Sequence, residues 1–208
     1  MHKLTALKCR GGFYMSIAAM TAIVLFILTA TGALQHTFEQ LHQRRGAVLF
    51  WLFCVLCLKI FLLSPIPEIE INIGFVPIML GPALLAAAKN ESGRVLPLAA
   101  ALGVVYAAAR FLLHKTETAV FVYGAAAFIA AFFFGKRCGF AAFAAAAASA
   151  PIFGALIEFA VEYIGIGYGV VQISTAVCDA QMVGAAACTA ACEAFKITKK
   201  SEIKANPT

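Results

Sequence analysis

The sequence has little charge. Asp, Glu, Lys and Arg make up only 12% of its 208 residues, about half the share that soluble domains carry. Apolar residues make up 62% of the chain, which is more than a water-soluble fold of this length can bury. This balance excludes an ordinary soluble domain and predicts an integral membrane protein whose principal partner is the lipid bilayer.

Acidic residues are fewer than basic ones, and the formal net charge is +6. The Lys and Arg residues lie in short clusters between apolar runs, where they set membrane topology. They do not form the basic patch that nucleic-acid binding requires, so no nucleic-acid partner is expected.

The alternation of apolar and polar residues that marks barrel strands is also missing, because the apolar runs are continuous and rich in Ala, Leu and Phe. They predict an all-α bundle of six to seven transmembrane helices in one domain, 1–195, followed by a loose, basic cytoplasmic tail, 196–208. The predicted segments are 12–34, 47–64, 71–88, 95–113, 119–134, 140–164 and 170–195. The first could instead be a signal peptide, but its apolar core is longer than such peptides carry.

The third segment is short and contains Pro77, Gly81 and Pro82, so it either spans the membrane or forms a broken, re-entrant element. Seven spans would place ten of the 16 Lys and Arg residues on the side of the C-terminus. A re-entrant third segment would place 12 of them there, together with the N-terminus, and the positive-inside rule favours this arrangement. Both topologies predict a multi-pass protein of a bacterial cytoplasmic membrane with a cytoplasmic C-terminus.

Catalytic motifs are absent from the sequence: there is no Walker loop, no HExxH and no Ser/His/Asp set. Cys54 and Cys57 have the spacing of a redox motif, but they lie in an apolar segment without a βαβ context. Intramembrane aspartyl proteases use two aspartates, one of them after a Gly-x-Gly sequence, and Asp179 follows Ala176-Val177-Cys178 instead. We therefore expect no enzyme activity, no cofactor and no metal.

Ionisable side chains inside the apolar segments are the candidate functional residues, because each is costly in hydrocarbon. Glu158 and Glu162 are four residues apart, so they share one face of a helix, either as a site or as residues of the membrane interface. Asp179 lies about 13 Å into the last segment at helical rise. Gln172 and Thr175 precede it at steps that place all three on one helical face.

Two further polar positions complete the candidate set. Arg110, in the fourth segment, either pairs with Glu158 or Glu162 or extends toward the membrane surface. Residues 65–74 (PIPEIEINIG) contain two prolines and alternating Glu and Ile, and end near Asn72. They predict an interfacial hinge, the mouth of a re-entrant element or a plain extended loop.

The chain resembles an uncharacterised bacterial membrane family, the domain of unknown function 1614 type, which is common in Firmicutes. The matching elements are Ile71-Asn72-Ile73-Gly74 before an early Pro77, and a last helix of the form Val170-Val171-Gln172-Ile173 followed by Asp179. Ser174-Thr175-Ala176 stands where that family tends to have a Gly-rich stretch. The resemblance covers 65–195, implies a membrane location and marks Asn72 and Asp179.

Two functions remain open. A small permease or ion-coupled carrier would bind a proton, a small cation or a small molecule at the acidic and polar residues of the last two segments. A non-catalytic membrane scaffold or assembly factor, for envelope or sporulation processes, fits the lack of catalytic motifs and the Ala-rich packing faces. A homo-oligomer is compatible with both.

Overall fold

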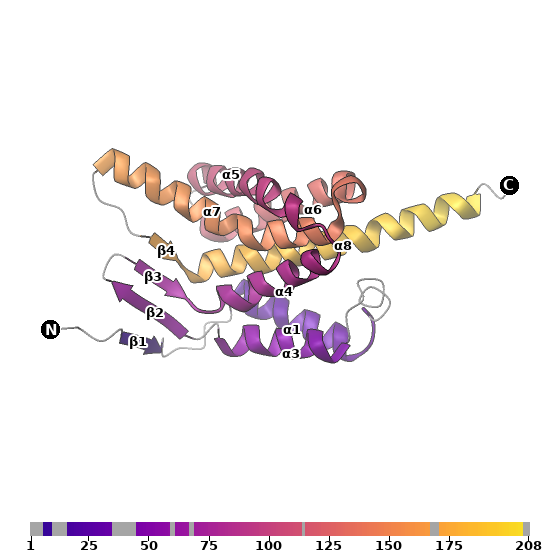
Figure 1. Ribbon diagram of the computed structural model, residues 1–208, viewed down its shortest axis with the longest axis horizontal. Helices are drawn as coiled ribbons and strands as arrows, with labels where there is room; N and C mark the ends of the chain where they lie inside the picture. Colours follow the sequence, from indigo (N-terminus) through magenta and orange to yellow (C-terminus); the bar gives the residue numbers. More distant parts are fainter. Residues whose placement is uncertain are drawn as a thin grey trace.

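The computed structural model describes residues 6–9, 16–34, 45–58, 61–66, 69–113, 115–166 and 171–205. These residues form seven α-helices, a 3-10 turn and a small sheet (Figure 1). The helices are α1 (Ile17–Ala30), α3 (Arg45–Leu58), α4 (Phe75–Ala88), α5 (Val95–Leu113), α6 (Thr116–Cys138), α7 (Phe140–Ile166) and α8 (Thr175–Ala205), and the 3-10 turn η1 (Ser92–Arg94) precedes α5.

Four helical segments are long and apolar enough to cross a membrane. They are η1 together with α5, then α6, α7 and most of α8. This confirms the prediction of an α-helical membrane protein. Helices α1, α3 and α4 have 14 residues each. Each is therefore about 21 Å long, shorter than the roughly 30 Å of a bilayer's hydrocarbon core.

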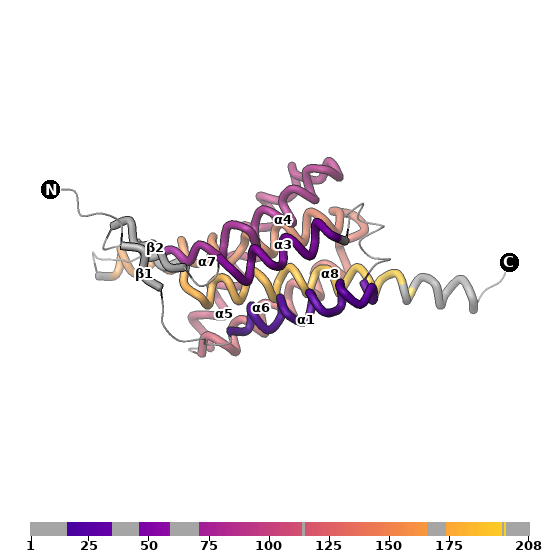
Figure 2. The backbone as a smooth tube through the Cα atoms, turned by 90° about the horizontal axis from the view of Figure 1, so that it is seen from below, coloured from indigo at the N-terminus to yellow at the C-terminus, as the bar shows by residue number. Residues whose placement is uncertain are grey.

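The helices pack in two layers. Helices α5, α6, α7 and α8 form a four-helix core, in which α7 contacts each of the other three. Residues 141–148 of α7 are all buried and mostly Ala, so neighbouring helices approach it closely. Helices α1, α3 and α4 form a second layer, which packs against α7 and α8 (Figure 2).

Helix α4, the third apolar segment, runs from one end of the bundle to the other. Its first residues follow strand β3 (Ile69–Asn72), which pairs with β4 (Val171–Ile173) between α7 and α8. Beyond its last turn, Glu91 accepts a hydrogen bond from the N–H of Ala142, and Arg94 donates to the carbonyl of Arg137, both at the α6–α7 connection. The described residues of the segment therefore form one continuous helix between the β3–β4 pair and the α6–α7 connection.

The sequence predicted no strands, yet one end of the bundle carries a four-stranded sheet of order β1-β2-β3-β4 (Figure 1). Strands β1 (Ala6–Cys9), β2 (Phe61–Ile66) and β3 pair antiparallel, whereas β3 and β4 pair parallel. The alternation from Ile69 to Asn72, which predicted a hinge, the mouth of a re-entrant element or an extended loop, is that of a strand. Pro65 lies where the register of β2 and β3 shifts, a position that tolerates proline.

The last segment differs from the prediction at both ends. Residues 171–173 are a strand, and α8 begins only at Thr175. At the other end the helix does not stop at Phe195 but continues to Ala205, so most of the predicted loose tail is helical and extends beyond the bundle (Figure 1).

Candidate functional site

Asp179 lies in the second turn of α8 at the junction between the two layers. Its side chain is buried, with 8% of the residue exposed. Its Oδ1 accepts a hydrogen bond of 2.9 Å from the backbone N–H of Ala18, in the first turn of α1. The buried residues around this contact come from four helices and include Ala22 of α1, Val55 of α3, Ile78 of α4 and Met182 of α8.

The N–H groups in the first turn of α1 have no acceptor within the helix, and Asp179 accepts a hydrogen bond from one of them. Ser16, the N-cap residue, accepts a hydrogen bond from Ala19 through its hydroxyl oxygen at 3.3 Å. The Asp179 carboxylate supplies a second acceptor from a different helix. Because the N-terminus of a helix carries partial positive charge, an ionised carboxylate is stabilised there. This contact explains how an acid can lie between two apolar helices.

Arg110 and Glu158 form an ion pair between α5 and α7. The Nε of Arg110 lies 3.1 Å from Oε1 of Glu158, and both side chains are half-buried. The Nη1 of Arg110 also donates to the hydroxyl of Thr116 at 2.6 Å, at the start of α6. Of the two interpretations of Arg110, the structure therefore has the paired one.

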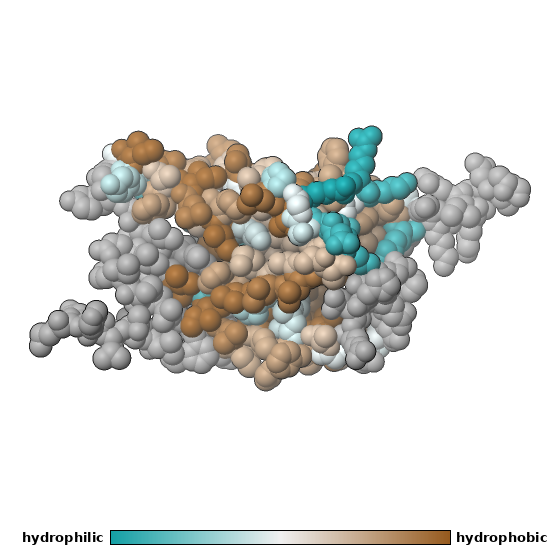
Figure 3. Space-filling view, in the orientation of Figure 1, coloured by the Kyte–Doolittle hydropathy of each residue, from teal (hydrophilic) through white to brown (hydrophobic). Residues whose placement is uncertain are grey.

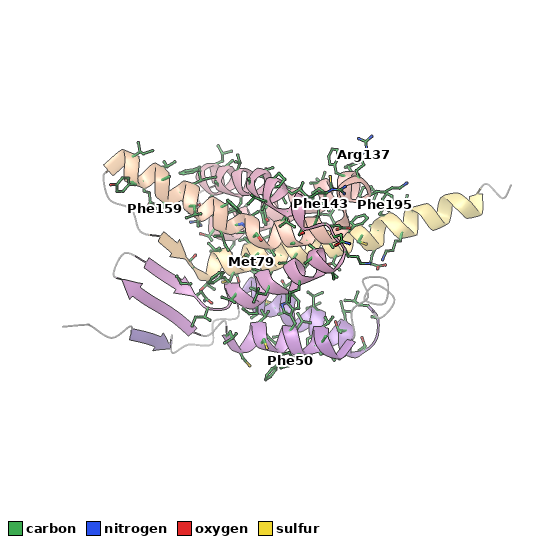
Figure 4. The ribbon with its side chains drawn as sticks, viewed as in Figure 1. Phe50, Met79, Arg137, Phe143, Phe159 and Phe195 are labelled. Carbon is green, nitrogen blue, oxygen red and sulfur yellow. The ribbon has the colours of Figure 1, made fainter. Side chains whose placement is uncertain are left out.

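Glu162 does not join this pair. It is exposed on the last turns of α7, near the protruding end of that helix on which Phe159 lies (Figure 4). Of the two interpretations of this pair of acids, a shared site or residues of the membrane interface, the structure gives Glu162 an exposed position apart from the ion pair. Only Glu158 lies where α5 can contribute a partner.

Tyr106, which was not among the residues predicted from the sequence, is a further polar residue of this interior. It is buried on α5, within electrostatic reach of Arg110, Glu158 and Asp179. Its ring packs edge-on against Tyr123 of α6, with 5.4 Å between the ring centroids. Tyr106 therefore adds a hydroxyl group to the interior that holds both Asp179 and the ion pair of Arg110 and Glu158.

Pro151, inside α7, leaves a backbone carbonyl of the core without its helical donor. A proline within a helix cannot donate to the carbonyl four residues earlier, which here is Ala147. The hydroxyl of Tyr123 donates to that carbonyl at 2.6 Å, and the side-chain amide of Gln181 donates to the carbonyl of Ala148 at 2.7 Å. The Tyr123 hydroxyl of α6 thus satisfies the carbonyl that the proline leaves free, and Gln181 of α8 adds a donor to the next carbonyl.

Gln181 was not among the residues predicted from the sequence either. The residue has no exposed surface, and its Oε1 has no hydrogen-bond partner among the described residues. It lies two residues after Asp179, on a different face of α8. Such a side chain can hold a small polar molecule in an otherwise apolar core.

The remaining predicted residues lie at the sheet end of the bundle. Asn72 is buried, and its side-chain oxygen accepts a hydrogen bond from the N–H of Gly74 at 2.9 Å, which fixes the entry to α4. Thr175 is the half-buried first residue of α8. Gln172 is in β4, where its backbone pairs with Glu70, so it is not on a helical face with Asp179 as predicted.

Within the described part of the chain, no cluster of three or more His, Cys, Asp or Glu residues could hold a metal ion. A search against protein-family models, curated proteins and solved structures finds no match to this chain. The chemistry of the interior residues is therefore what bears on function: a carboxyl at a helix N-terminus, an ion pair and two buried tyrosines.

Proposed function

We propose that this chain is a small multi-pass permease of a bacterial cytoplasmic membrane, coupled to a proton or small cation at Asp179. The observation that carries the proposal is the hydrogen bond between the Asp179 carboxylate on the core and the Ala18 amide on the second layer. An ionisable group at such a junction is a candidate coupling site, because an acid inside a membrane protein is costly to keep.

The coupling follows from charge. When the Asp179 carboxylate is ionised, it is attracted to the partial positive charge at the N-terminus of α1. When it is protonated, that attraction is lost. Proton occupancy and the position of α1 against α8 are then linked, so a proton gradient can move one layer against the other. Movement of one helix bundle against another is how many secondary transporters alternate access.

For the topology we propose seven crossings with the C-terminus in the cytoplasm. The exposed basic residues Arg94, Lys136 and Arg137 lie at the bundle end toward which α8 runs. Basic residues favour the cytoplasmic side. The three short helices would cross with the help of the segments that flank them, or in a locally thinned bilayer.

The test uses the purified chain reconstituted in vesicles that contain a pH-sensitive dye. Under an imposed pH gradient, the wild type is expected to carry protons and Asp179→Asn to carry none. Asn keeps an oxygen that can accept from Ala18 but cannot ionise. The matched control is Glu162→Gln, because Glu162 is exposed on α7. Equal proton flux in the wild type and Asp179→Asn, or none in the wild type, would reject the coupling role.

A membrane scaffold is the second candidate, and the same hydrogen bond favours it. Since Asp179 caps α1, the acid has a structural reason to be present even without transport. The scaffold function expects Asp179→Asn to behave as wild type in flux and in assembly, whereas loss of the acceptor in Asp179→Ala weakens the contact between the layers.

A further inference from the structure

A cavity of about 260 Å³ lies between the second layer and the core. Its walls come from α1, α3 and α4, and α7 and α8 close its inner side. The lining side chains are nearly all apolar and include Val48, Trp51, Leu85, Met182 and Ala186, with Thr189 as the polar exception. Its size is close to the lower end of the range for small-molecule sites, roughly 300–1,000 Å³.

The cavity opens toward the surface that a membrane would cover. Leu84 of α4 lines it and is 67% exposed, and Ala47 of α3, which also lines it, is exposed as well. Exposed apolar side chains on these two helices face hydrocarbon once the protein is in a bilayer. An apolar recess that is open to hydrocarbon suits an acyl chain and offers little to a polar substrate.

Trp51 forms one wall of the cavity in a fixed orientation. Its indole N–H donates to the carbonyl of Pro77 on α4. Gly81 allows the ring to lie against α4, since a side chain there would overlap the indole. The ring is therefore held at the cavity wall. Trp51 is the single tryptophan of the sequence.

Basic residues lie at the end of the bundle that is closest to the cavity. Lys89 follows Leu85 by one helical turn, and the exposed Arg94, Lys136 and Arg137 are at the same end. Among the described residues of this end, the acidic ones are Glu91, which accepts from the N–H of Ala142, and Glu193, which lies 3.1 Å from Lys196, so basic side chains outnumber acidic ones. Hydrophilic side chains gather at this end (Figure 3), and Arg137 projects from it (Figure 4).

We propose that the cavity holds one acyl chain of an anionic phospholipid whose phosphate headgroup lies against Lys89 and the neighbouring basic residues. The apolar walls bind the chain, and the positive end selects the headgroup, because basic side chains near a membrane surface attract anionic lipids. This inference does not depend on transport, since a scaffold can hold such a lipid equally well.

Trp51 itself is the reporter for the test. The chain is reconstituted in phosphatidylcholine vesicles that contain an equal fraction of either brominated phosphatidylglycerol or brominated phosphatidylcholine, and tryptophan fluorescence is recorded. Bromine on an acyl chain in the cavity quenches Trp51. The expected preference for phosphatidylglycerol is about fivefold, the factor that corresponds to about 1 kcal/mol for one basic residue.

Two pairs of variants separate chain binding from headgroup binding. Ala186→Phe fills the cavity and is expected to remove most of the quenching, whereas Ala125→Phe, on an exposed face of α6, is expected to leave it unchanged. Lys89→Gln is expected to lower the preference for phosphatidylglycerol, whereas Lys115→Gln, at the other end of α5, is not. Circular dichroism checks that each variant is folded.

Two results would overturn the proposal. Equal quenching by the two brominated lipids, unchanged by Ala186→Phe, would mean that Trp51 meets bulk lipid only. Protection of Trp51 from both lipids would mean that a second copy of the chain or another protein fills the cavity.

Discussion

The N–H of Ala18 and the carboxylate of Asp179 meet at 2.9 Å although 161 residues separate them in the sequence. This hydrogen bond joins the first turn of α1 to the second turn of α8, and so joins the second layer to the four-helix core. An acid that the sequence places deep in an apolar helix is thereby matched to the one kind of backbone group that attracts a negative charge.

Removal of the acceptor at position 179 is expected to destabilise the protein. Asp179→Ala leaves the Ala18 amide without its partner and should lower the free energy of unfolding by about 1–2 kcal/mol. Asp179→Asn, which keeps an acceptor, should cost less. Melting curves in detergent measure both, and amide exchange at Ala18 should be faster in the Ala variant only. Equal melting temperatures for the wild type and Asp179→Ala would contradict a capping role.

Tyr123→Phe is expected to destabilise the protein, because Pro151 leaves the Ala147 carbonyl without a helical donor. Without the hydroxyl group, the carbonyl of Ala147 loses its donor inside the core, which should cost about 1–3 kcal/mol. Tyr163→Phe, on the exposed end of α7, is the control and should cost nothing measurable. In a Pro151→Ala background the helix itself can supply the N–H, so the effect of Tyr123→Phe should shrink. Full additivity of the two changes would refute this account.

The ion pair between Arg110 and Glu158 should appear as coupling in a double-mutant cycle. Glu158→Gln and Arg110→Gln each remove one charge of a half-buried pair, and the coupling energy should be about 1 kcal/mol. Glu162→Gln, one turn further along α7, should show no coupling to Arg110 because it is exposed there. The measurement is thermal unfolding in detergent for the single and double variants.

Reporter fusions test the direction of α4. If α4 crosses the membrane, fusions after Glu70 and after Glu91 should report opposite sides, with Glu91 and the C-terminus in the cytoplasm. Alkaline phosphatase, which is active only outside the cytoplasm, provides the assay. Activity at both positions, or at neither, would mean that the segment returns to the side from which it enters, contrary to the path of α4 from β3 to η1.

Most of the helices could be predicted from the sequence because they depend on local composition. Continuous apolar runs can exist in lipid only as helices here, so the segments 95–113 and 140–164 closely match α5 and α7. The strands were missed because residues 61–66 and 171–173 continue apolar runs, and a short strand in such a run cannot be told from helix by its composition.

The sequence by itself determined that this is an α-helical membrane protein and that Asp179, Glu158 and Arg110 lie in its apolar segments. Only the tertiary structure decided what these residues meet. Helical spacing places Glu158 and Glu162 on one face, but packing against α5 decides that one is paired and the other exposed. The Ala18 amide has no side-chain signal in the sequence, because a backbone donor becomes a partner only when two distant helices bring it to a carboxylate.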